Sequence, residues 1–171
     1  LLPGLAAALG QLLLLPLASL PARALDIQEV VSPSGIRAWL VQDRTAPVIS
    51  MSFAFKGGGA LDPASKDGAT RMMAALLDEG AGPYDSTQFH AAVEAIAAQL
   101  SFNADADYVT GSLRSLSEKR EQAFELLRLA LGEPRFAEPD VERIRGQILS
   151  NLRSSATSPN WIAGRALSKA I

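Results

Sequence analysis

The sequence predicts an α+β fold in which helices pack on a largely antiparallel sheet. Two observations predict it: apolar and polar residues alternate before residue 57 and again over residues 101–116, whereas other segments are apolar at helical spacing. The hydrophobic fraction of 48% is sufficient for a globular core. The net charge is −2 and no lysine or arginine cluster stands out, so nothing supports nucleic-acid binding.

Three extended segments open the fold. Residues 27–43 contain two of them, separated by the turn signal Pro33-Ser34-Gly35. Residues 46–58 alternate as a third strand that ends in the glycine run at positions 57–59. Two further strand segments are expected within residues 101–116. Because strands come first and helices dominate later, we expect helices layered on a mostly antiparallel sheet.

The helical segments follow from spacing and end signals. Ser65 or Asp67 is expected to cap the first helix, and Asp85 with Ser86 the second. Gly132 is expected to close the third. Helices are predicted over residues 68–79, 86–100, 117–132 and 138–156, and from residue 158 onward.

The first 24 residues are read as a secretory signal peptide. An apolar run, Leu12 to Leu20, is too short and too interrupted by proline for a spanning helix, and Ala22-Arg23-Ala24 resembles a cleavage site. The alternative is an apolar N-terminal helix of the fold. The chain has no cysteine, hence no lipid-anchored cysteine and no disulfide. We therefore predict an exported chain, periplasmic or secreted, with no stable membrane anchor.

One segment carries a family resemblance. Residues 57–80 read GGGALDPASKDGATRMMAALLDEG, with a glycine run, the pair Asp62-Pro63 and Gly68 ahead of a helix. This order resembles the insulinase/pitrilysin-type zinc peptidases, which include the mitochondrial processing peptidases. The resemblance covers residues 26–171 and implies that residues 25–171 are the N-terminal, processing-peptidase-like half-module of such a protein, truncated at its C-terminal end.

In the family resembled, that helix carries His-x-x-Glu-His. Histidines at i and i+4 reach one Zn²⁺ from one helix face, the glutamate acts as base, and a distal glutamate completes the ligands. The equivalent positions here are Arg71, Ala74, Ala75 and Asn151. A guanidinium stays protonated and offers no lone pair, and alanine has neither ligand atom nor base. The resemblance therefore implies a non-catalytic member that holds no metal itself. Arg71 is expected instead to pair with Asp67.

Other candidate sites are weaker. His90, the single histidine, lies one helical turn before Glu94, which is a poor zinc site. Asn103, Asp105 and Asp107 have the spacing that begins a calcium loop, but Tyr108 stands where glycine is required. A strand with one polar face explains the alternation better.

The resemblance also suggests a peptide-lining strand. Asn103 and Ala104 match the family segment that lies beside the cleft and pairs with substrate peptide. The alternative is an ordinary exposed strand.

Three functions remain open at this point. The resemblance implies a catalytically silent subunit that forms a heterodimer with a zinc-bearing homologous subunit and helps to enclose peptide substrates. In that case zinc is expected in the partner only. The alternatives are a non-enzymatic scaffold on the same fold, and an active zinc peptidase whose motif lies outside these residues.

Overall fold

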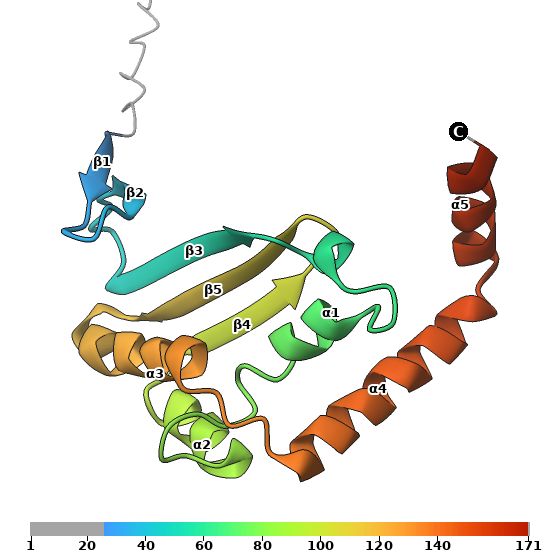
Figure 1. Ribbon diagram of the computed structural model, residues 1–171. Coiled ribbons are helices and arrows are strands. Elements are labelled where there is room, and N and C mark those ends of the chain that lie inside the picture. The colour runs from blue at the N-terminus through green and yellow to red at the C-terminus, as the bar shows by residue number, and fades with distance from the viewer. Residues whose placement is uncertain (1–25, 171) are drawn as a thin grey trace, which may run out of the picture. The chain divides into compact units, whose positions relative to one another are not determined.

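The computed structural model describes residues 26–170, and the predicted signal peptide lies outside them. The chain forms two compact units, one ending at Thr45 and the other beginning at Ala46. No helix in residues 26–170 is both long and apolar enough to cross a membrane. The α+β class expected from the sequence is confirmed: antiparallel strands and helices make up the described part of the chain (Figure 1).

The described part of the first unit is a two-stranded hairpin. Strand β1 (Ile27–Val31) pairs antiparallel with β2 (Arg37–Val41), with Val31 opposite Arg37. Gly35 adopts a φ of +86° in the connecting turn, a conformation that favours glycine. The two extended segments and the turn between them are therefore as predicted.

A three-stranded sheet forms the base of the second unit. Strands β3 (Val48–Lys56), β4 (Gln99–Ala104) and β5 (Tyr108–Leu116) lie in the order β3-β5-β4, and both pairs are antiparallel. Phe53 lies opposite Gly111, and a Cβ at Gly111 would come within 2.2 Å of the Phe53 ring. Because glycine has no Cβ, the Phe53 ring can approach the backbone of the central strand closely.

Strand alternation gives this sheet two different faces. One face carries Met51, Phe53 and Leu113, which pack with Ala123 and Leu127 of helix α3 (Arg120–Gly132). The opposite face carries small polar side chains and is open, with a Ser101–Ser112 hydroxyl pair at 2.8 Å. Period-two patterning therefore buries one face and exposes the other.

The helices differ in length from those expected. Helix α1 is Ala69–Ala74, α2 is Ser86–Ala95, α4 is Glu138–Ala156 and α5 is Pro159–Ala170, with short 3₁₀ turns at Gly59–Leu61 (η1) and Ser117–Lys119 (η2). The second helix was expected to reach residue 100, but Ala97 takes a positive φ of 49° and the chain turns into β4. Leu100 still packs on the core, from a strand rather than a helix.

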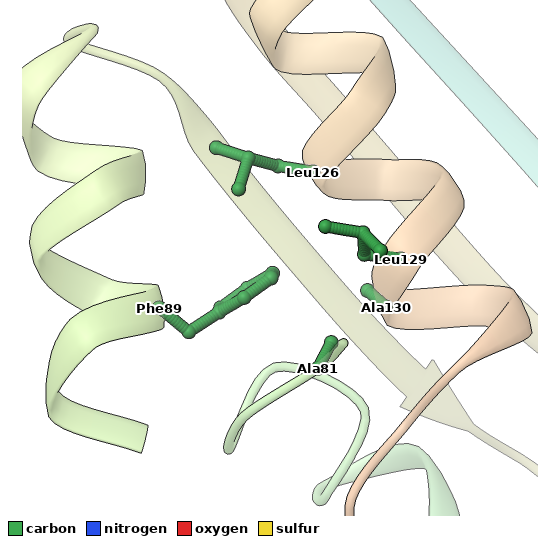
Figure 2. Packing of buried hydrophobic residues seen from close by; sticks show 5 residues of the cluster. All are labelled: Ala81, Phe89, Leu126, Leu129 and Ala130. Carbon is green, nitrogen blue, oxygen red and sulfur yellow. The ribbon is translucent and has the colours of Figure 1, made fainter. Parts of the chain in front are cut away.

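A second part of the core lies between α2 and α3. Phe89 is fully buried there with Leu126, Leu129 and Ala130 of α3 and Ala81 of the loop after α1 (Figure 2). The aromatic ring of α2 thus joins the third helix to the segment that follows the first.

Candidate functional site

The start of α1 is fixed by Asp62, six residues before the N-cap of the helix. Gly68 stands at the N-cap with a φ of 91°, and its N–H donates to Asp62 Oδ2 at 2.9 Å. The hydroxyl and the N–H of Thr70 donate to Asp62 Oδ1 at 2.5 Å and 3.1 Å. Capping by Ser65 or Asp67 was wrong, because the left-handed turn at Gly68 presents the first helical N–H groups to Asp62 instead.

This anchor predicts a pH dependence. The Thr70 hydroxyl bond holds the pKa of Asp62 below its usual range. A carboxyl with a lowered folded-state pKa stabilises the fold above about pH 4, and that stability is lost as the pH falls through the folded value. We therefore expect Asp62→Asn to lower the urea midpoint at about pH 7 and to flatten its decline below about pH 4. An equally steep acid decline in Asp62→Asn would contradict this assignment.

The four motif-equivalent positions lie in different environments. Arg71 is exposed on α1, Ala74 is 1% exposed, and Ala75 is half-buried at the C-cap. Asn151 is exposed on α4. The helix ends at Ala74 rather than at Glu79 as expected, and Leu76 and Leu77 are buried in the turns beyond it. The glutamate position of the motif is therefore sealed in the core.

A groove runs beside these positions with a volume of about 950 Å³. Its walls are the loop from Gly59 to Gly68, the first turns of α1, the end of β4 and one face of α4. Arg71 and Ala104 both line it, although 33 residues separate them in sequence. Helix α4 contributes Arg145, Ile148, Leu149 and Leu152, whereas Asn151 is not among the lining residues.

The two predicted peptide-lining residues lie on different surfaces. Ala104 lines the groove, while Asn103 lines the open face of the sheet. The two residues are adjacent in the chain, and the backbone N–H of Ala104 donates to the side-chain Oδ1 of Asn103 at 2.9 Å. The next N–H, of Asp105, donates back to the Tyr108 carbonyl in the hairpin at 3.0 Å. Because N–H directions alternate along a strand, the N–H of Ala104 points away from β5.

An ion-pair cluster that sequence reasoning missed joins α4 to Glu79, in the segment that follows α1. Arg143 donates to Glu79 at 2.5 Å and to Asp140 at 3.1 Å, and Ser86 donates to Glu79 at 2.7 Å. Burial alone would raise the pKa of Glu79, but the Arg143 and Ser86 bonds outweigh it and leave that pKa lowered. The sequence signal is weak, because Glu79 and Arg143 are 64 positions apart.

The weaker zinc and calcium candidates, and the expected Arg71–Asp67 ion pair, are not metal sites or ion pairs in the described residues. His90 is exposed on α2, and no group of three metal-ligating side chains occurs within residues 26–170. Asp105 accepts from the N–H groups of Asp107 and Tyr108 and so shapes the turn between β4 and β5. The expected Arg71–Asp67 pair is not among the ion pairs of the described residues; Asp67 precedes the left-handed Gly68 and so is not on the helix.

Zinc does not fit the residues present. A fixed guanidinium charge at Arg71 would repel the metal, and neither alanine offers a ligand atom. At most the Asn151 amide oxygen remains, and one weak ligand does not make a tetrahedral site. The chemistry open to this groove is therefore binding through a cation, an apolar wall and a strand edge.

Helix α1 lies beside β4, the edge strand of the three-stranded sheet, and the groove is lined by both. The family model described as Insulinase (Peptidase family M16) matches residues 37–171, and the chain belongs to this family. The chain has a single histidine and so cannot contain His-x-x-Glu-His.

One curated protein and two solved structures are similar to this chain. A non-peptidase homolog, YmxG, from Helicobacter pylori is 24% identical over 84% of this chain and 33% of its own length. The peptidase M16 inactive domain from Pseudomonas fluorescens is 28% identical, with a TM-score of 0.78 over 85% of this chain and 35% of that one. A protease from Helicobacter pylori, 16% identical, shares the fold with a TM-score of 0.69 over 81% of this chain and 33% of that one.

The family match confirms the predicted membership of the insulinase family, and two of the similar proteins are themselves described as a non-peptidase homolog and an inactive domain. The chain spans about a third of the length of the relatives that it matches.

Proposed function

We propose that this chain is a catalytically silent subunit that binds extended peptides and pairs with a zinc-bearing homologous subunit in an exported peptidase. The observation that supports it best is the groove beside β4. Within the described residues β4 pairs only with β5, so its other edge has no partner strand. The N–H of Ala104 points toward that edge and donates to Asn103 Oδ1 at 2.9 Å, an acceptor that a peptide carbonyl would replace. An extended peptide can add to such an edge through backbone hydrogen bonds.

The residues at the motif-equivalent positions suggest which role each of the two subunits would have. By the family resemblance, the buried Ala74 stands at the base position and Arg71 at the first histidine position, so this chain would contribute binding surface and not a nucleophile. The partner would supply zinc, base and water in the periplasm or outside the cell. A scaffold without proteolysis remains the alternative.

Peptide binding is tested at the strand edge. A fluorescent unfolded peptide should bind the full chain, and Ala104→Pro should abolish binding because proline removes the outward N–H. The matched control is Ala104→Gly, which keeps the N–H and should retain binding. Circular dichroism of all three proteins checks that the fold persists. Equal binding by Ala104→Pro and wild type would refute edge pairing.

Pairing is tested with the homologous subunit. The two chains should co-purify, zinc should be found only in the partner, and peptide cleavage should require both. Cleavage by the isolated chain would overturn the proposal. Co-purification without any cleavage would favour the scaffold.

A further inference from the structure

Arg71 stands out in the groove as a cation without an internal partner. Its side chain is exposed, it lines the groove, and none of the ion pairs among residues 26–170 includes it. Arg145, on the opposite wall, is already paired with Glu142 on its own helix. Lys66 adds a second cation on the loop wall, also without an ion pair in that part of the chain. Two cationic groups are thus free to meet a ligand.

The acids of the groove are mostly engaged in holding the backbone. Asp62 accepts from Gly68 and Thr70, and Asp105 accepts from Asp107 and Tyr108. A carboxylate that already accepts two or three hydrogen bonds has few acceptor sites left for a guanidinium. Asp67 is the remaining acid of the lining and lies on the loop before Gly68.

The other wall is apolar. Ile148, Leu149 and Leu152 of α4 line it, and Met72 extends it onto α1. Leu149 and Leu152 are 45% and 47% exposed, so their side chains are available for contact. A ligand in this groove would therefore meet a strand edge, a guanidinium and an aliphatic strip.

We propose that the groove selects extended peptides that place one acidic side chain against Arg71 and neighbouring apolar side chains against α4. The proposal deepens the peptide-binding function and rests on it. Arginine presents a planar fork of donors that matches a carboxylate in two parallel hydrogen bonds. Arg71, which occupies the position that the family resemblance equates with a zinc ligand, would thus give the groove its specificity for an acidic side chain.

The test uses the full chain and synthetic peptides of alternating alanine and leucine. A single glutamate is moved along the peptide one position at a time, and each peptide has a glutamine twin. At one position the glutamate peptide should bind roughly tenfold more tightly than its twin, as expected for a hydrogen bond to a charged group. Fluorescence anisotropy at constant ionic strength measures both.

Variants assign the preference to one side chain. Arg71→Gln should remove the preference, and Arg71→Glu should favour a lysine peptide instead. The matched control is Arg114→Gln, which alters an exposed arginine on β5 that does not line this groove and should change nothing. Each variant changes an exposed side chain, so the fold should persist.

The outcomes separate the two proposals. Equal binding of glutamate and glutamine peptides by wild type, or an unchanged preference in Arg71→Gln, overturns the acidic specificity alone. Absence of binding by any peptide overturns the peptide-binding function and the specificity with it. Binding that survives Ala104→Pro refutes pairing at the β4 edge, which both proposals use.

Discussion

Placing a glutamate at position 74 is expected to destabilise the second unit by about 3–5 kcal/mol, the cost of an unpaired buried charge. Ala74 is 1% exposed, and it is the position that the family resemblance equates with the general base. The larger side chain also overpacks the space between α1 and its neighbours, which costs about 1–3 kcal/mol more when the site cannot relax. Restoring the motif residue should therefore damage the fold.

The effect of Ala74→Glu should depend on pH in a defined direction. Burial raises the folded-state pKa of a carboxyl above its unfolded value of about 4.3. The unfolded state is then stabilised by ionisation as the pH rises, so the loss of stability should be smallest below about pH 4 and should grow above it. Chemical denaturation across this range measures the loss.

Two controls separate charge from size. Ala74→Gln has nearly the same volume without a charge, so its cost should not change with pH. Ala91→Glu introduces the same carboxyl at an exposed position of α2 and should change stability by no more than about 0.5 kcal/mol. A cost for Ala74→Glu no larger than that of Ala91→Glu would show that the base position is still open.

The sequence predicted the strands well because period-two patterning depends only on near neighbours. Residues 46–58 were expected to form a strand, and β3 spans Val48–Lys56 within them. The helix predicted over residues 138–156 was also correct. Apolar residues recur at helical spacing among charged ones along this segment, and Pro139 lies in its first turn.

The errors arose where tertiary contacts override local signals. Helix α1 ends at Ala74 although good helix formers continue to Glu79, because that segment is drawn into turns that bury Leu76 and Leu77. The cap of α1 comes from Asp62, which local spacing did not identify. Such contacts are invisible to patterns read one segment at a time.

In the candidate site, too, some features follow from the local sequence and others only from tertiary contacts. The resemblance placed Arg71 and Ala104 in their segments, but only the fold brings both into one groove. The α4 wall carries a usable signal, since Arg145, Ile148, Leu149 and Leu152 recur at helical spacing. The burial of Ala74 carries none, because alanine is common both inside proteins and on helix surfaces.

The second large effect is expected for Phe89→Ala. Phe89 is fully buried among Leu126, Leu129, Ala130 and Ala81 (Figure 2). Removing a buried phenylalanine ring loses its transfer free energy and leaves a cavity, which together cost about 3–5 kcal/mol. A domain is stable by only about 5–15 kcal/mol, so this single change removes a large share of the margin.

The loss should reach the groove as well as the core. Ala81 belongs to the loop that follows α1, and a Cβ at Gly82 in the same loop would meet Leu129 at 2.6 Å. Phe89 and Leu129 therefore help to hold in place the segment that leads out of the groove wall. The free energy of unfolding from urea titration and the affinity for peptide should both fall in Phe89→Ala.

The matched control for Phe89→Ala is Phe124→Ala on α3, whose side chain is 38% exposed. Less of that ring is removed from water, so its loss should cost much less. Equal destabilisation by the two variants would show that Phe89 is not the centre of this core. If Phe89→Ala lost stability but kept full peptide affinity below its unfolding transition, the groove would be independent of the α2–α3 core, and Asp62 and the Arg143 cluster would suffice to hold its walls.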